Sequence, residues 1–479
     1  RQSPLGCYGN KSNHTPNIDT IAQDGIFFKH VFTAAPWTRP SFASIFTSTY
    51  PSQHTAEHHN SLLPNDISTL AQMMQKQGYF TVGFAKTRFD GFVGPGAGFA
   101  KGFDVYFHYD DAKEVNKAFD NYLANNSEAF SRIGGGGVFI FHHFFDPHAP
   151  YENHFPEIIK NKGLLGDAKL QGTLLWEKLY PQSPGSANGK DIEYAVKVYE
   201  SESAYVDTTI GTAITRLKDY KIYKDLNIII CADHGESFNE KYGVWNHGNP
   251  YATCTRVPLI LRFPKTITPV PLIDNILISN LDIMPTILEL AEIPIPNTLE
   301  GQSLLNLEDI DNNRFCISED LKNGSLAIRN IRYKLVAIPA ALPMVDHIDP
   351  YKFWKSIQPG TSDHAVTRNE LESLREWIIL RKNSPTKYEL YDLILDPFEN
   401  RDIATEEENI FHILYLELLR HCLKTGIITS DNLQWIREGS ISNTEMESLK
   451  TVHISNGYQP EYLDLQEDTI EALKAQGYL

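Results

Sequence analysis

The sequence predicts an α/β protein in which helices cover both faces of a large, mostly parallel sheet, with a smaller α+β domain after it. Three apolar runs of strand length, which begin at Val138, Leu226 and Val257, have the continuous hydrophobic character of strands buried on both faces. Two long polar or amphipathic stretches, 110–133 and 191–218, alternate with them and are long enough for helices. This alternation is typical of parallel sheets, whose ligands sit at the carboxyl ends of the strands.

Local signals place further elements along the chain. Pro40 suits the first turn of a helix, so we expect a helix to begin at or just after Thr38. From about Asn306 the chain is richer in charged residues, and its apolar runs, 326–329 and 334–338, are short. We therefore expect a main domain over residues 1–306. A smaller domain should follow over 307–479, with a short antiparallel sheet and a closing amphipathic helix at about 465–475.

The composition excludes several classes of partner. The 479 residues include 43 Lys and Arg against 60 Asp and Glu, and the net charge of −17 argues against nucleic acid and anionic membrane surfaces. A small anion in a locally positive site is compatible with this balance. No run of about 18 apolar residues is present, so we expect no transmembrane segment in this chain. The oligomeric state is left open.

The five cysteines argue against a disulfide framework. They are odd in number and widely spaced, and they form no Cys-x-x-Cys pair. Unpaired cysteines favour the cytoplasm. The chain starts at Arg1 rather than Met, however, so a signal peptide upstream of Arg1 is also compatible with the sequence.

Three polar clusters have the composition of a reactive site. Asp233-His234-Gly235-Glu236 directly follows a predicted strand, and His247 comes shortly after it. A carboxylate and an imidazole at the end of a strand suit a divalent metal, and Gly235 permits a tight turn. The alternative is that Asp233 caps a helix and that His234 is an ordinary loop histidine.

The second cluster surrounds Thr38. A hydroxyl at a helix N-terminus lies where free N–H groups and the helix dipole favour negative charge, so it could act as a nucleophile. The alternative is that Thr38 or Ser41 is simply the N-cap. Arg39 could bind an anion through its forked guanidinium group, or it could be a surface arginine.

The third cluster runs from His142 to Tyr151, at the end of a predicted strand. Because side chains alternate along a strand, only some of its polar groups can share one face. We expect His148, in the loop, to be a ligand or proton donor. His142 and His143 could be a structural pair, whereas our site assignment gives substrate contacts to His143 and Asp146.

Together these clusters resemble the sulfatase branch of the alkaline phosphatase superfamily. Motifs in the family's order extend over most of the chain, and the main ones are Leu5-Gly6-Cys7-Tyr8-Gly9, Thr15-Pro16-Asn17-Ile18-Asp19, Thr38-Arg39-Pro40-Ser41, Asp233-His234-Gly235-Glu236 and Glu389-Leu390-Tyr391-Asp392-Leu393. The resemblance implies an alkaline-phosphatase-like fold. It also implies that Asp233, His234 and Thr38 bind one divalent metal ion, which could be Ca, Mg, Mn or Zn.

The resemblance also assigns catalytic roles. Thr38 would be the nucleophile, while His148 and His247 would contact the anion or protonate the leaving group. Lys86 follows a stretch similar to the one that carries the family's substrate-contacting lysine, although Thr87-Arg88 replaces the usual Trp-His. The expected substrate is a small anionic ester of phosphoric or sulfuric acid. Loops over 153–190 and 341–382 would set specificity.

Two departures from the family pattern matter. Sulfatases carry Cys or Ser at the nucleophile position, converted to formylglycine, and Arg four residues later, where this chain has Thr38 and Phe42. Threonine cannot become the aldehyde, so the expected route is direct attack by its hydroxyl, as in relatives that act on phosphodiesters, phosphonates and phospholipid head groups. Second, Arg1-Gln2-Ser3-Pro4 lacks the strand and aspartate that precede the first motif in the family. We expect Arg1 to be a truncation point.

These departures leave three hypotheses. The first is a metal-dependent hydrolase of phosphoric or sulfuric esters with Thr38 as nucleophile. The second is a phospho-head-group transferase, in which an alcohol replaces the water and the same residues act. The third is a non-catalytic protein that keeps the fold but lacks a complete metal centre.

Overall fold

The computed structural model describes most of the chain. The described residues are 1–12, 14–57, 61–87, 93–132, 137–149, 151–152, 154–158, 189–241, 245–264, 272–339, 386–427, 451–452 and 461–462. They form two compact units, the first ending at Asp320 and the second beginning at Leu321. The domain boundary at residue 306 stays a prediction, and the helix expected at 465–475 lies outside the described residues.

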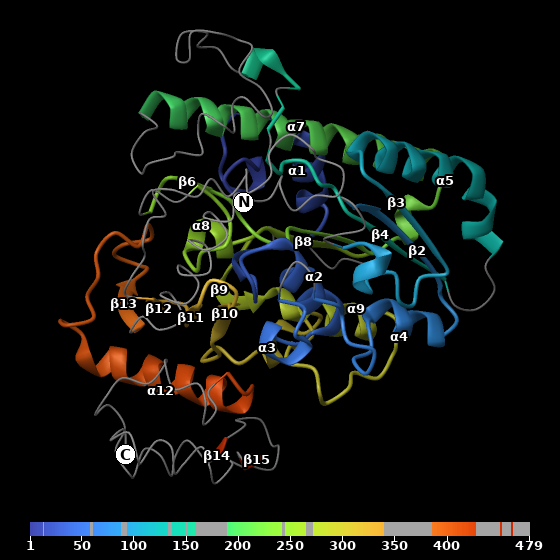
Figure 1. Cartoon of the computed structure of the whole chain (residues 1–479). Helices are drawn as coiled ribbons and strands as arrows, with labels where there is room; N and C mark the ends of the chain where they lie inside the picture. Colours follow the sequence, from blue (N-terminus) through green and yellow to red (C-terminus); the bar gives the residue numbers. More distant parts are fainter. Residues whose placement is uncertain are drawn as a thin grey trace, which may run out of the picture. The chain divides into compact units, whose positions relative to one another are not determined.

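Two sheets form the centre of the first unit (Figure 1). One has the strand order β5-β8-β1-β9, and the other has the order β3-β2-β4. Their bounds are β1 (Ile26–Phe32), β2 (Phe80–Lys86), β3 (Val105–Tyr109), β4 (Val138–His142), β5 (Ile228–Cys231), β8 (Leu259–Arg262) and β9 (Leu272–Ser279). The second sheet is entirely parallel, whereas in the first only β1 and β9 are paired in parallel.

The strand β8 departs from the parallel arrangement that the sequence predicts, because it runs antiparallel to both β1 and β5. A parallel neighbour to β5 would need a long crossover, usually a helix. Between Cys231 and Leu259 the only helix in the described residues is the single turn α8 (Ala252–Thr255). The chain therefore returns beside β5 in the opposite direction.

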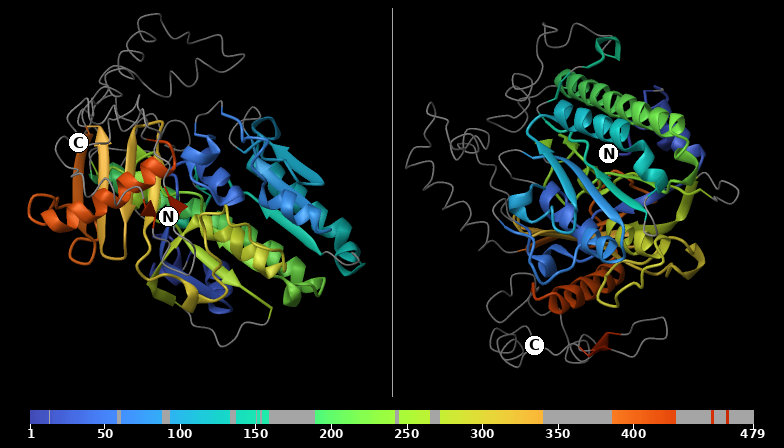
Figure 2. Two further views of the ribbon diagram at one scale, coloured as in Figure 1. Left: turned by 90° about the horizontal axis from the view of Figure 1, so that it is seen from below. Right: turned by 90° about the vertical axis from the view of Figure 1, so that its right-hand side faces the viewer.

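Helices cover both faces of the second sheet. On one face α5 (Ala112–Arg132) packs on β2 and β3, and α7 (Gly189–Asp219) lies beside α5 (Figure 2). On the other face α4 (Leu70–Lys76) and α9 (Ile283–Leu290) share a hydrophobic cluster with Phe139 of β4. Alternation along the strands separates these two sets of contacts. Together the sheets and their helices confirm the predicted α/β fold class.

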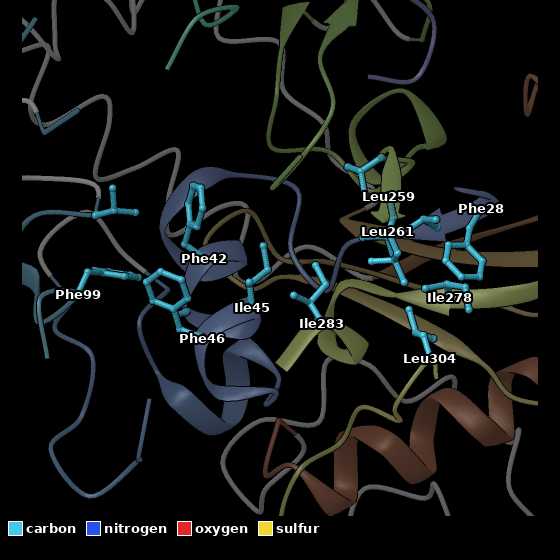
Figure 3. Packing of buried hydrophobic residues seen from close by; sticks show 14 of the residues in the cluster. Phe28, Phe42, Ile45, Phe46, Phe99, Leu259, Leu261, Ile278, Ile283 and Leu304 are labelled. Carbon is cyan, nitrogen blue, oxygen red and sulfur yellow. The ribbon is translucent and has the colours of Figure 1, made fainter. Parts of the chain in front are cut away.

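The largest hydrophobic cluster within the described residues anchors α2 (Thr38–Thr47) beside the sheets (Figure 3). Phe42, Ile45 and Phe46 of this helix pack in one cluster with Phe28, Leu259 and Ile278 of the first sheet. Burial of a side chain of this size contributes about 1.5–3 kcal/mol. The cluster therefore fixes α2, and with it the position of Thr38.

In the second unit α12 (Glu408–Lys424) packs on an antiparallel sheet of β11 (Ser325–Arg329), β12 (Tyr333–Pro339) and β13 (Thr386–Asp392). The unit also contains a fully buried ion pair, in which Nζ of Lys334 lies 2.6 Å from Oε1 of Glu399. The described part of the smaller unit is thus built on a short antiparallel sheet.

The remaining elements are short. They are α1 (Pro16–Gln23), α3 (Pro51–His54), β6 (Ser237–Phe238), β7 (Trp245–Asn246), β10 (Cys316–Asp320), β14 (Thr451–Val452), β15 (Glu461–Tyr462) and the 3-10 helices Gly6–Tyr8, Pro95–Ala97, Pro156–Ile158, Tyr223–Asp225, Asn280–Asp282 and Leu307–Asp309.

Two strands, β4 and β5, are end strands of their sheets in the described part of the chain. Their apolar side chains are only half-buried, and Cys231 at the end of β5 is exposed. None of the helices in the described ranges has an apolar stretch long enough to cross a membrane.

Candidate active site

The predicted nucleophile, Thr38, is the first residue of α2. Trp37 occupies the N-cap position in an extended conformation and makes no side-chain capping hydrogen bond, so neither Thr38 nor Ser41 is the N-cap. Thr38 is only 2% exposed. Its hydroxyl oxygen lies 3.1 Å from Nε2 of His234. The N–H groups and dipole at this helix end favour negative charge on that oxygen.

Ser41, one turn along α2, fastens the helix to the loop that follows β5. Its hydroxyl donates to the Asp233 carbonyl at 2.6 Å and accepts from Nδ2 of Asn280 at 3.0 Å. It also lies 2.8 Å from the hydroxyl of Thr33. The side chains of Ser41, Thr33 and Asn280 are fully buried. Ser41 therefore sets the distance between α2 and Asp233.

His234 presents a defined nitrogen to Thr38. Its Nδ1 lies 2.7 Å from the carbonyl oxygen of Gly235, which can only accept a hydrogen bond. Nδ1 therefore carries a proton, and Nε2 is the nitrogen that the ring presents to Thr38. A Cβ at Gly235 would lie 2.1 Å from the carbonyl oxygen of Thr253. Close packing, rather than a positive φ, explains why this turn needs glycine.

Asp233 completes a donor set suited to a cation. Its Oδ2 lies 3.5 Å from Nε2 of His234, and its side chain is 19% exposed. Burial acts to raise the pKa of Asp233, but His234, His143 and a backbone N–H outweigh it and the pKa is lowered. A carboxylate, an imidazole and the Thr38 hydroxyl are ligands that Ca, Mg, Mn or Zn accept. No three His, Cys, Asp or Glu side chains form a ready-made metal cluster in the described ranges.

The two neighbouring histidines at the end of β4 lie in different environments. His143 packs edge-on against Phe42, with ring centroids 4.9 Å apart, and its charge interacts with Asp233. Burial lowers the pKa of His143 to about 4. His142 instead stacks on Phe119 of α5, with centroids 4.5 Å apart. The alternation of the strand therefore places only His143 beside the candidate site.

Lys86 ends β2, next to the end of β4. Its Nζ lies 3.8 Å from the ring centroid of Phe145, and its charge interacts with His143 and with Asp146. Because β2 and β4 are parallel, their carboxyl ends lie at the same edge of the sheet. This register brings the predicted lysine to the same place as His143 and Asp146.

Two further histidines, His148 and His247, lie next to each other in the loops of the site. The ring of His247 lies 5.2 Å from that of His148 and 4.4 Å from that of His234, measured between centroids. Nδ1 of His148 lies 2.5 Å from the Ala149 carbonyl, so this nitrogen carries the proton. Burial, followed by the charge of His247, lowers the pKa of His148 to about 3.

Glu236 is a member of this site to which the sequence analysis gave no role. Its Oε1 lies 3.7 Å from Nδ1 of His247, and its side chain is 4% exposed. Burial raises the pKa of Glu236, while His148 and His234 oppose the shift. The position of Glu236 two residues after His234 was a usable signal. A carboxylate beside Nδ1 of His247 can hold that ring in place.

Arg39 is buried, although a surface position was one alternative. It is 4% exposed, Nη1 donates to the Ser61 carbonyl at 2.6 Å, and Nε has no hydrogen-bond partner. Burial lowers the pKa of Arg39 to about 10. No contact given by the structure joins its guanidinium to Thr38.

The structure thus brings most of the predicted side chains together. Hydrogen bonds, ring contacts or electrostatic interactions connect Thr38, Lys86, His143, Asp146, His148, Asp233, His234 and His247. Arg39 is close to them in sequence but is oriented toward Ser61. The catalytic and metal-binding roles of all these residues stay predictions.

Comparisons with known proteins agree with the motifs. The profile of the sulfatase family matches residues 1–293. An ulvan-active sulfatase of Formosa agariphila is 26% identical over 452 residues, which cover 89% of this chain and 79% of the relative. The uncharacterized sulfatase YidJ of Escherichia coli is 26% identical over 373 residues, or 68% of this chain and 73% of the relative.

Solved structures share the fold at lower identity. BT1596, a 2-O GAG sulfatase, has a TM-score of 0.63 and 19% identity, over 89% of this chain and 90% of that one. The phosphonate monoester hydrolase SpPMH of Silicibacter pomeroyi has a TM-score of 0.61 and 18% identity, over 88% and 93%. The family profile covers more than half of the chain. The chain therefore belongs to the sulfatase family of ester hydrolases.

Proposed function

We propose that the chain is a metal-dependent hydrolase of sulfuric or phosphoric esters that uses Thr38 as its nucleophile. The observation that carries this proposal is the position of the Thr38 hydroxyl, buried at the N-terminus of α2 and 3.1 Å from Nε2 of His234. A helix end stabilises the negative charge of an attacking oxygen.

Asp233, His234 and the Thr38 hydroxyl would hold the divalent ion, since they supply a carboxylate, an imidazole and a hydroxyl. When bound, such an ion lowers the pKa of the hydroxyl and neutralises charge on the transferring group. The lowered pKa of Asp233 supports this role, because it keeps an ionised carboxylate at the site.

Side chains of the protein carry out the remaining chemical steps. The Thr38 hydroxyl gives its proton to a water molecule. Its Oγ1 attacks sulfur or phosphorus and forms a covalent ester with the protein, while the bond from sulfur or phosphorus to the alcohol oxygen breaks. His247 gives a proton to that departing oxygen, since the Nδ1 proton of the neutral His148 is held by the Ala149 carbonyl. Lys86 binds the peripheral oxygens through its positive charge. Water then hydrolyses the Thr38 ester and restores the hydroxyl.

The residue at position 38 favours this route over that of a typical sulfatase. The threonine side chain has a methyl group on Cβ and cannot become the aldehyde of formylglycine, so attack by the hydroxyl remains. Four residues later Phe42 is buried and packs against His143, where the family pattern has arginine. The fold shared with a phosphonate monoester hydrolase supports testing phosphorus esters beside sulfate esters.

The test replaces Thr38 and follows turnover of an aryl sulfate, an aryl phosphate monoester and an aryl phosphodiester with Ca, Mg, Mn or Zn. Thr38→Ala should abolish turnover, and Thr38→Ser should keep part of it, because serine supplies the same hydroxyl. Thr47→Ala is the matched control, since Thr47 ends the same helix and bonds to the Ala43 carbonyl at 2.7 Å. Turnover by Thr38→Ala equal to that of the control would overturn the nucleophile assignment.

A further inference from the structure

Two carboxylates near Lys86 each have a buried oxygen without a donor. Glu202, on α7, is 2% exposed, and its Oε2 has no hydrogen-bond partner. Its Oε1 accepts from the backbone N–H of Glu152. Asp146, after β4, likewise has a buried Oδ2 with no partner. Leaving such an acceptor unpaired in a protein interior is unfavourable, so both oxygens indicate a ligand group that donates hydrogen bonds.

The two carboxylates act on each other. Burial comes first among the causes that raise the pKa of Glu202 well above its usual range, and the charge of Asp146 adds to it. Burial also raises the pKa of Asp146. Lys86 opposes both shifts. The three side chains therefore form one electrostatic group.

The segment that follows Asp146 is hydrogen-bonded to α7, the helix that carries Glu202. The N–H of Glu152 donates to Glu202, and the N–H of Phe155 donates to the hydroxyl of Ser201 at 2.8 Å. The ring of His154 stacks on Tyr205 with centroids 4.2 Å apart. These contacts hold the segment that follows Asp146 against the helix that carries Glu202.

The charges do not balance once the proposed substrate is bound. Asp146 and Glu202 carry two negative charges when both are ionised, against one positive charge on Lys86. Without a further cation, their raised pKa values favour a bound proton instead. In the proposed function Lys86 also binds the anionic ester, which adds at least one further negative charge. A positive group on the substrate would compensate the carboxylates and supply the N–H donors that their unpaired oxygens lack.

We propose that the natural substrate is an amino-substituted ester, whose alcohol portion carries an ammonium group that donates to Asp146 and Glu202. This inference rests on the proposed function. Amino alcohol and amino sugar esters are the chemical class that combines the two charges. An ammonium group supplies the N–H donors that the two carboxylate oxygens lack.

The experiment compares matched esters that differ by one amino group: 2-aminoethyl sulfate against ethyl sulfate, and glucosamine 6-sulfate against glucose 6-sulfate, with the corresponding phosphates. The wild-type protein should prefer the amino ester by about 10- to 100-fold in kcat/KM, the range expected for hydrogen bonds to charged groups. Glu202→Gln should reduce this preference by about 10-fold, mainly through KM. The control Glu200→Gln makes the same change on the same helix, where Glu200 pairs with Lys197 at 2.7 Å, and should keep the preference.

The outcomes separate the two proposals. If the wild-type protein turns over none of the aryl or alkyl esters, the proposed function fails. If it turns them over without preferring the amino ester, or if Glu202→Gln keeps the preference, the carboxylate pair does not bind an ammonium group. Inhibition gives a second measurement in case Glu202→Gln does not fold. 2-Aminoethyl sulfate should inhibit wild-type turnover of an aryl ester at lower concentration than ethyl sulfate, and equal inhibition would overturn the inference.

Discussion

Ser41→Ala tests whether the serine between α2 and the Asp233 loop sets the geometry of the site. The substitution removes three buried hydrogen bonds, at 2.6, 2.8 and 3.0 Å. Thr33 and Asn280 keep other partners, the carbonyl of Ala35 and the N–H of Ala34, both at 2.8 Å. The Asp233 carbonyl loses the Ser41 hydroxyl as its hydrogen-bond donor.

The expected loss of unfolding free energy follows from these contacts. The bonds of Ser41 to Thr33 and Asn280 contribute about 1 kcal/mol each, because both partners keep other hydrogen bonds. The buried Asp233 carbonyl loses its donor, which costs about 1–3 kcal/mol. The sum is about 3–5 kcal/mol, measured as a lower midpoint in urea. Turnover of an aryl ester should fall by about 10- to 100-fold, because the Asp233 loop is no longer held against Thr38.

Ser44→Ala is the matched control. Ser44 is equally buried on the same helix, and its hydroxyl lies 3.1 Å from Nε2 of His54, away from the candidate site. This variant should lose about 1–2 kcal/mol and keep wild-type turnover. If both variants have the same urea midpoint and full turnover, the reasoning about Ser41 is refuted.

Two further predictions concern stability. Lys334→Ala removes the ammonium group that lies 2.6 Å from the buried Glu399 carboxylate, so the free energy of unfolding should fall by about 3–5 kcal/mol in urea titrations; an unchanged midpoint would contradict this. Burial lowers the pKa values of His54 and His142 to about 3. The unfolded chain, with ordinary values near 6.5, then binds protons that the folded chain does not. Stability should therefore fall as pH drops from about 6.5 toward 3, by up to about 1.4 kcal/mol per pH unit for each histidine. Equal urea midpoints at pH 7 and pH 5 would contradict this predicted loss of stability.

The sequence predicted the parts of the site that depend on local pattern. Pro40 and the apolar residues after it indicated a helix that begins at Thr38, and a buried strand before Asp233 placed the Asp-His pair at a strand end. The helix and the strand are in the structure, but the isoleucine side chains of the strand are half-buried rather than buried. Alternation also indicated that His142 and His143 could not share a face.

Other parts depend on contacts between distant segments and could not be read from local pattern. The amphipathic pattern of α7 predicts a helix, but it does not show that Glu202 is the acidic residue that packs near Asp146. The antiparallel direction of β8 follows from the lack of a long crossover after β5 in the described residues, whereas the sequence predicted only a mostly parallel sheet. The orientation of Arg39 toward Ser61 depends on a loop 22 residues away in sequence.

The open sides of β4 and β5 have a consequence for the behaviour of the protein in solution. Within the described residues each strand ends its sheet, and each presents half-exposed apolar side chains. An end strand offers unpaired N–H and C=O groups that can template another extended chain, and the isoleucines of β5 have high β propensity. The protein should therefore associate through strand pairing as its concentration rises, and a charged substitution on the exposed side of β5 should improve its solubility.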